Sequence, residues 1–135
     1  MEIVDNYLDK TSFKLLNEAM NSDMFPWFFN DYKLNPDTDD DSLFNYQLTH
    51  VFYKDFKINS NYFDTLYPLI LKMNVKALVR IKANLLTRTP KIVVNDYHVD
   101  HDKKNWNTSI FYINTNNGYT EFKDGTIISS VANRL

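Results

Sequence analysis

The stretch Lys76-Ala77-Leu78-Val79-Arg80-Ile81-Lys82-Ala83-Asn84-Leu85 marks the point where the pattern of the chain changes. From Ala77 to Leu85, every second residue is apolar, and most residues between them are polar. Successive side chains of a strand point to opposite faces of the sheet, so this alternation predicts a half-buried strand. Before it, helical spacing prevails; after it, short strands are predicted in close succession.

Two helices are predicted upstream of this stretch. The first begins near Thr11 or Ser12, and its apolar face is formed by Phe13, Leu16, Ala19 and Met20. The second begins after Asn59 or Ser60, and Pro68 is expected to kink or split it. Short strands are predicted over residues 3–8 and 44–52. The acidic run 37–42 lacks the spacing of a calcium loop and is interpreted as a solvated loop.

Further strands are predicted downstream, over residues 92–98, 108–114, 119–123 and 126–133. Asp124-Gly125 is a strong hairpin signal between the last two. Such a succession favours a sandwich or barrel over a parallel α/β sheet. We therefore predict a single, mainly β domain of the α+β class over 1–135, with helices and strands in 1–75 and the β core in 76–135.

Composition excludes several classes of protein. The chain has no cysteine, which rules out disulfides and thiolate metal sites. A formal charge of −2 gives no reason to expect nucleic acid or an anionic membrane as a partner. The first residues do not form a signal peptide, and the apolar runs are far shorter than a membrane span, so a cytoplasmic location is expected.

The segment most informative about chemistry is Asp96-Tyr97-His98-Val99-Asp100-His101-Asp102. In an extended strand His98 and Asp100 point to the same face, so an imidazole and a carboxylate can converge on one ion. With a second histidine from elsewhere they would form the facial triad of non-haem Fe(II) oxygenases. His-x-Asp is a short pattern that also arises by chance, and a solvated loop is the alternative interpretation.

The neighbouring segments resemble a known family. Thr108–Asn114, with its Phe111-Tyr112 pair, and Asn117-Gly118-Tyr119-Thr120-Glu121-Phe122 are similar to the middle of prolyl-hydroxylase-like, Fe(II)- and 2-oxoglutarate-dependent oxygenases. The run from Phe25-Pro26-Trp27 through Arg80–Leu85 to Ser130–Arg134 resembles the version found in marine phages, which would place the protein in the host cytoplasm. The resemblance extends over nearly the full chain.

This resemblance implies a double-stranded β-helix of the jelly-roll or cupin type. His98 and Asp100 would bind Fe(II), and Tyr112 would donate a hydrogen bond to the co-substrate 2-oxoglutarate, with ascorbate as an accessory reductant. An ordinary buried tyrosine bonded to a neighbour is the alternative for Tyr112. Arg80 and Asn84 are candidates for the co-substrate pocket, against the simpler role of solvated strand residues. The substrate would be a prolyl or other protein side chain, or a small molecule.

The chain departs from the family pattern at its end. No histidine follows His101, and no basic residue stands where the family clamps the distal carboxylate of 2-oxoglutarate. We therefore expect an incomplete oxygenase, inactive alone, that needs a complementing chain or a homo-oligomer. His50 is a possible third ligand, but a buried, hydrogen-bonded structural histidine is the favoured interpretation.

Two alternatives belong to other classes. The string from Asp96 to His101 is one residue away from the His-x-His-x-Asp-His motif of metallo-β-lactamase-like hydrolases, with Asp96 where that motif needs histidine. The other alternative is a non-catalytic binding or assembly module, in which an open sheet edge near Ile127, Ile128 and Val131 pairs with a partner strand.

Overall fold

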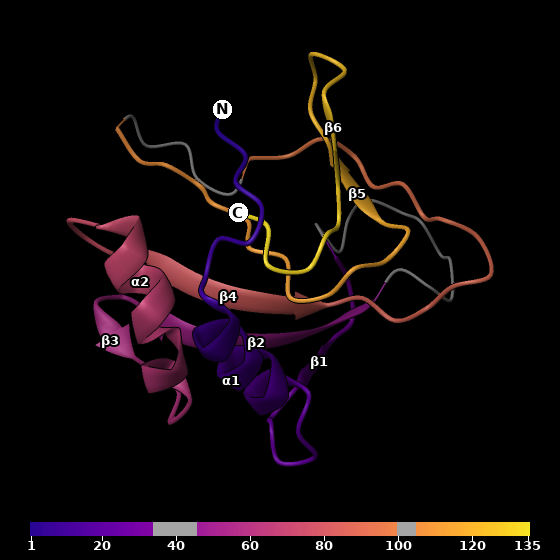
Figure 1. The fold of residues 1–135 in the computed structure, drawn as a ribbon. Helices are drawn as coiled ribbons and strands as arrows, with labels where there is room; N and C mark the ends of the chain where they lie inside the picture. The colour runs from indigo at the N-terminus through magenta and orange to yellow at the C-terminus, as the bar shows by residue number, and fades with distance from the viewer. Residues whose placement is uncertain (34–45, 100–104) are drawn as a thin grey trace. The chain divides into compact units, whose positions relative to one another are not determined.

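The structure is a computed structural model that describes residues 1–33, 46–99 and 105–135. It is a small α+β protein with two α-helices and antiparallel sheets (Figure 1). Two compact units are distinguished within it, one formed by Met1–Phe13 with Val94–Leu135 and the other by Lys14–Val93. The elements in chain order are α1 (Lys10–Met20), β1 (Phe28–Asn30), β2 (Gln47–Lys54), β3 (Lys57–Ile58), the 3-10 helix η1 (Phe63–Leu66), α2 (Tyr67–Met73), β4 (Arg80–Leu85), β5 (Tyr119–Glu121) and β6 (Ile127–Ser129).

The larger unit is built on a four-stranded antiparallel sheet with β2 at its centre (Figure 1). β4 pairs along one side of β2, with a β-bulge between Val51 and Tyr53. Along the other side, β1 pairs with the first half of β2 and β3 with its end. β2 and β3 are joined by Asp55-Phe56, both at positive φ (52° and 60°), as a type I′ hairpin turn requires.

The core of this unit gathers around the buried face of β2. His50 and Phe52 lie on that face at 3% and 1% exposure. The ring of Phe25 packs against both, with centroids 4.4 Å from His50 and 5.8 Å from Phe52. Other buried apolar residues of the unit are Leu16, Met20, Phe63 and Leu66. β2 overlaps the strand predicted over 44–52. Its burial does not alternate strictly, because Gln47 is buried along with His50 and Phe52, whereas Leu48 is half-buried.

The first helix follows the predicted spacing, but its cap is a different residue. Leu16 and Met20 are the buried positions of α1. The Asp9 carboxylate accepts hydrogen bonds from the backbone N–H groups of Thr11 and Ser12, both at 3.0 Å, so Asp9 caps the helix. Hydrogen bonds from Ser12, first from its side chain and then from its backbone, lower the pKa of Asp9.

The predicted split of the second helix is confirmed. η1 ends at Leu66, and α2 begins at Tyr67 with Pro68 in its first turn. Proline lacks a backbone N–H and fixes φ, which suits a first turn and prevents a continuous helix through it. α2 ends at Met73 and is capped by Asn74, whose backbone is left-handed (φ 50°).

The smaller unit contains the β5–β6 hairpin that the Asp124-Gly125 signal predicts. Gly125 adopts φ 84°, a conformation that glycine reaches without a Cβ penalty. The Asp124 side chain accepts a hydrogen bond from the backbone of Thr126 at 2.9 Å. This bond, followed by the one from the Thr126 side chain, lowers the pKa of Asp124.

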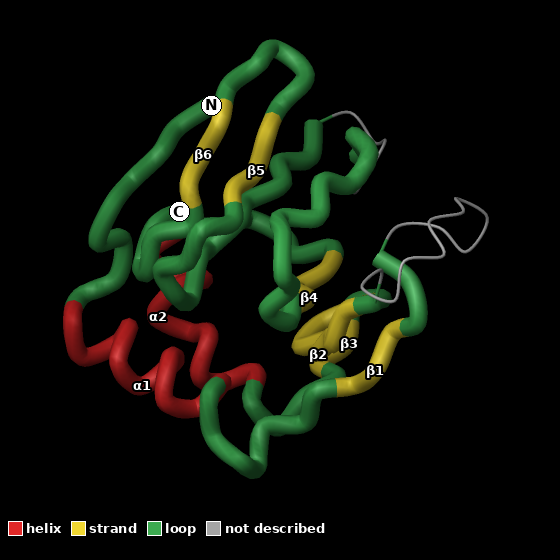
Figure 2. Tube along the Cα trace, turned by 90° about the vertical axis from the view of Figure 1, so that its right-hand side faces the viewer, coloured by secondary structure: helices red, strands yellow, loops and turns green. Residues whose placement is uncertain are grey.

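In the same unit the two ends of the chain lie side by side (Figure 2). Val4 and Leu135 exchange two backbone hydrogen bonds, of 2.8 and 3.0 Å, and Tyr7 donates one to Asn133 at 2.8 Å. Asp5 forms an ion pair with Arg134, with Nε 2.6 Å from Oδ1 and Nη2 2.9 Å from Oδ2. Residues 133–135 are thus bonded to the N-terminal segment. Among the described residues β6 pairs with β5 alone, and the open sheet edge expected near Ile127, Ile128 and Val131 stays a prediction.

Three predicted strands do not form. Residues 3–8 make the contacts just described without becoming a strand, residues 92–98 have no strand structure, and residues 108–114 contribute one isolated bridge, between Tyr112 and Arg134. β4 also begins at Arg80 rather than Ala77. Alternation describes only where side chains point, whereas a strand needs a hydrogen-bonded neighbour. Figure 2 draws the described parts of the connection between β4 and β5, residues 86–99 and 105–118, as loop.

The described residues do not cover every prediction. The acidic loop 37–42, the start of the strand predicted over 44–52, and Asp100, His101 and Asp102 lie outside them. Within the described ranges, no helix is long and apolar enough to cross a membrane.

Candidate functional site

His98 lies on an exposed, irregular segment of the smaller unit. Its Nδ1 is 3.4 Å from the carbonyl oxygen of Asp96, a long contact that fixes the ring only weakly. Within the described ranges, its Nε2 atom has no hydrogen-bond partner. An imidazole that is exposed, with one nitrogen unoccupied, has the form that a metal ligand requires.

The strand geometry that would bring His98 and Asp100 to one face is not present at His98, because residues 92–98 do not form a strand. Asp100 itself lies outside the described residues. Beside His98, Tyr97 donates a hydrogen bond to the Glu121 carboxylate at 3.0 Å. That bond raises the pKa of Tyr97 and ties the segment to β5.

His50 occupies a different environment. Its Nδ1 is 2.7 Å from the carbonyl oxygen of Pro26, and its Nε2 is 2.7 Å from the Ser60 hydroxyl. A carbonyl oxygen only accepts, so Nδ1 carries a hydrogen, and in the neutral ring Nε2 accepts from Ser60. The favoured structural interpretation is confirmed, because His50 is buried and neither ring nitrogen is available to a metal ion.

Tyr112 is half-buried in the smaller unit, where its backbone bridges to Arg134. Its hydroxyl oxygen is 2.7 Å from the Thr120 hydroxyl on β5, and either group can be the donor. If Thr120 donates, the phenol keeps its own hydrogen for another acceptor. The arrangement therefore accommodates both a structural tyrosine and a tyrosine that donates to a bound carboxylate.

Arg80 and Asn84 belong to β4 in the larger unit, and both are exposed. In the sheet they stand opposite Lys54 and Thr49 of β2, respectively. Their proposed role toward 2-oxoglutarate stays a prediction.

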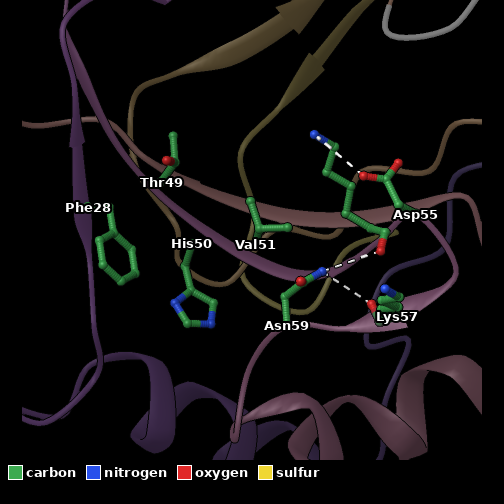
Figure 3. Close-up of a pocket in the computed structure, with 8 residues that line it drawn as sticks. Phe28, Thr49, His50, Val51, Asp55, Lys57 and Asn59 are labelled. Carbon is green, nitrogen blue, oxygen red and sulfur yellow. Dashed lines mark hydrogen bonds and ion pairs between the residues drawn. The ribbon is translucent and has the colours of Figure 1, made fainter.

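The larger unit also contains a surface pocket of about 500 Å³, which sequence reasoning did not anticipate (Figure 3). Three of its polar side chains, those of Lys54, Asp55 and Asn59, are engaged with other lining residues. The Lys54 ammonium is 3.8 Å from the Asp55 carboxylate, and the Asn59 amide donates to the carbonyl oxygens of Lys54 (3.4 Å) and Lys57 (3.2 Å). The lining residues are Phe28, Thr49, His50, Val51, Lys54, Asp55, Lys57 and Asn59.

The sequence holds little that would reveal this pocket. It forms around the hairpin turn Asp55-Phe56, which lacks the Asn-Gly or Asp-Gly pair that announces such turns. The alternation of β2 places Thr49 and Val51 on one face, but the neighbour Phe28 comes from β1, far back along the chain.

In the ranges that the structure describes, no three histidine, aspartate or glutamate side chains group as a metal site would require. Comparisons with protein-family models, curated proteins and solved structures gave no match.

Proposed function

We propose that this chain is an Fe(II)- and 2-oxoglutarate-dependent oxygenase module of the prolyl-hydroxylase-like kind, with His98 and Asp100 as metal ligands. One contrast supports it. Of the two histidines in the described residues, His98 exposes an imidazole with an unoccupied Nε2, whereas both nitrogens of His50 are bonded. A double-stranded β-helix is part of this proposal, with β5–β6 as one of its hairpins.

Tyr112 is the residue assigned to the co-substrate. Its hydroxyl oxygen lies 2.7 Å from the Thr120 hydroxyl, and either group can donate in that contact. With Thr120 as the donor, the phenol hydrogen points to an acceptor outside the pair, and a carboxylate oxygen of 2-oxoglutarate fits that need. Tyr112 and His98 belong to the same unit of the chain.

With dioxygen as the oxidant, the metal and co-substrate would supply the oxidising chemistry: 2-oxoglutarate would be converted to succinate and carbon dioxide by one oxygen atom, and the other would be inserted into a substrate C–H bond. The chain's own part is to hold the ion and orient the co-substrate. Because His50 is engaged, the third ligand position falls to His101 or to a histidine of another chain. A prolyl or other protein side chain is the substrate class that the resemblance favours.

Metal titration is the direct test. Mn(II), a redox-stable substitute for Fe(II), is titrated into the whole chain by calorimetry. His98→Ala and Asp100→Ala are expected to abolish binding, since each removes one of the proposed ligands of the metal ion. Asp96→Ala is the matched control, because it removes an exposed carboxylate two residues before His98 and leaves both proposed ligands in place.

The outcomes separate the alternatives. Unchanged affinity in both ligand variants would refute the oxygenase assignment. Tight binding of two zinc ions that depends on Asp96 would favour a hydrolase of the metallo-β-lactamase kind. No binding of any divalent ion by the wild type, in a folded chain, would favour the non-catalytic module.

A further inference from the structure

The loop before β5 contains the dipeptide Asn117-Gly118. Asn-Gly pairs are prone to deamidation, a reaction in which the backbone nitrogen of the glycine attacks the side-chain carbonyl carbon of the asparagine. Glycine favours the attack because it has no Cβ to hinder the approach and its backbone is flexible. Whether this pair reacts in the folded protein depends on what holds the Gly118 nitrogen.

The Gly118 nitrogen is held by Asn116, the residue that precedes Asn117 in the chain. The Gly118 N–H donates a hydrogen bond to Oδ1 of Asn116 at 2.7 Å. The Asn116 side chain is itself fixed, since its Nδ2 donates to the Ser130 hydroxyl at 3.1 Å and to Oδ1 of Asn114 at 3.3 Å. A Cβ added at Gly118 would lie 2.8 Å from Oδ1 of Asn116, so the Asn116 carboxamide packs directly against the glycine.

The backbone around the pair is anchored as well. Ser130, only 6% exposed, donates its N–H to the Gly118 carbonyl oxygen at 3.0 Å and its hydroxyl hydrogen to the Asn114 carbonyl oxygen at 3.0 Å. The Asn116 N–H donates in turn to the Ser130 carbonyl oxygen at 3.3 Å. Both backbone polar groups of Gly118 are therefore engaged, so the peptide planes on both sides of Gly118 are held and its nitrogen has little freedom to approach the Asn117 side chain.

Asn117 itself is exposed, and no contact restrains its side chain among the described residues. The carbonyl carbon that would be attacked and the amide that would leave are thus open to water. In the described residues, the pair is therefore restrained at the attacking nitrogen of Gly118 and not at the side chain of Asn117.

We infer that Asn117 is a latent deamidation site and that Asn116 suppresses its reaction by holding the Gly118 N–H. For the reaction, this N–H must lose its proton to solvent base. The nitrogen then bonds to Cγ of Asn117, and the side-chain nitrogen leaves as ammonia. Water opens the resulting succinimide to aspartate or isoaspartate. Either product adds one negative charge, and isoaspartate adds a methylene to the backbone just before β5.

The test measures aspartate and isoaspartate at position 117 by peptide mapping after incubation of the whole chain at mildly alkaline pH. The free peptide of residues 114–120 provides the unprotected rate. The folded wild type is expected to react more slowly than the peptide. Asn116→Ala is expected to raise the rate in the folded chain roughly two- to tenfold, the factor that one net hydrogen bond provides.

Asn116→Asp is the matched control. A carboxylate still accepts from the Gly118 N–H but cannot donate to Ser130, so this variant is expected to stay as slow as the wild type. Thermal melting establishes that both variants are folded. A wild type as fast as the peptide, or a folded Asn116→Ala as slow as the wild type, would overturn the inference. Equal acceleration in both variants would also overturn it, because anchoring to Ser130 would then be the cause.

Discussion

The side chain of Asn133 forms hydrogen bonds with the backbone of Leu8, 125 residues earlier in the chain. Its Oδ1 accepts from the Leu8 N–H and its Nδ2 donates to the Leu8 carbonyl oxygen, both at 2.8 Å. Both residues are buried, at 7% and 4% exposure. The carboxamide thus satisfies two backbone groups that would otherwise lie buried and unbonded just before α1.

Asn133→Gly is expected to lower the free energy of unfolding by about 2–4 kcal/mol, since two buried backbone groups lose their partners. Asn133→Ala is expected to cost roughly 1 kcal/mol more than Asn133→Gly, because glycine relieves the Cβ strain at the positive φ of 62° and alanine does not. Urea denaturation followed by circular dichroism measures both values.

The control for this prediction is Asn6→Ala. Asn6 also has a positive φ (51°), but it is exposed, and its side chain makes no hydrogen bond within the part of the chain that the structure describes. Alanine keeps the Cβ, so this variant loses only the greater tolerance of asparagine for the left-handed region, at most about 1 kcal/mol. An Asn133→Gly variant within about 0.5 kcal/mol of the wild type would show that the pairing contributes nothing.

Ser60→Ala tests the arrangement around His50. The Ser60 hydroxyl bonds to His50 Nε2 at 2.7 Å and accepts from the Tyr62 N–H at 3.0 Å. Its loss leaves a buried imidazole nitrogen without a donor, so we expect about 1–3 kcal/mol of destabilisation. Ser22→Ala removes an exposed hydroxyl bonded to the Ala19 carbonyl oxygen and is expected to change stability by less than about 0.5 kcal/mol. Equal effects would contradict the buried role of Ser60.

Local signals predicted the local parts of this fold. The spacing of Leu16 and Met20 identified α1, Pro68 identified the division of the second helix, and Gly125 identified the hairpin. Each depends on neighbours within a few residues. The strand predicted over 108–114 does not form, because strand pairing depends on a distant segment. In the described part of this stretch, Tyr112 alone forms a bridge, with Arg134.

The same limit applies to the candidate site. The pattern around His98 indicates metal-binding chemistry, but same-face geometry with Asp100 was deduced from a strand that does not form. For His50, alternation predicted a buried face. It could not show that the carbonyl oxygen of Pro26, 24 residues earlier, forms a hydrogen bond with one ring nitrogen of His50. Side-chain partners of this kind depend on tertiary packing, which periodicity does not encode.

The Asp5–Arg134 ion pair predicts a pH dependence of stability. The hydrogen bond from Arg134, more than its charge, lowers the pKa of Asp5 below the ordinary value of 3.8. Folding therefore favours the ionised form. The contribution is complete above the ordinary value and is lost as the pH falls through the lowered one. Asp5→Asn is expected to lower the melting temperature at neutral pH, and its difference from the wild type should shrink below about pH 4.

Asp31→Asn is the matched control for this titration. Asp31 is exposed and forms no ion pair in the described ranges. Its substitution is expected to leave the melting temperature near that of the wild type at neutral pH. A gap between Asp5→Asn and wild type that stays constant down to pH 3 would show that the ion pair does not contribute to stability.

Tyr112→Phe tests the co-substrate assignment while retaining the ring. We expect 2-oxoglutarate to bind more weakly by about 0.5–1.5 kcal/mol, the net value of one hydrogen bond. The measurement is calorimetric titration with Mn(II) present. Thr120→Val is the decisive companion, because it removes the 2.7 Å contact and keeps the phenol. If Tyr112 donates to 2-oxoglutarate, Thr120→Val weakens binding less than Tyr112→Phe. Equal affinity in Tyr112→Phe and wild type would leave Tyr112 with the Thr120 contact as its whole role.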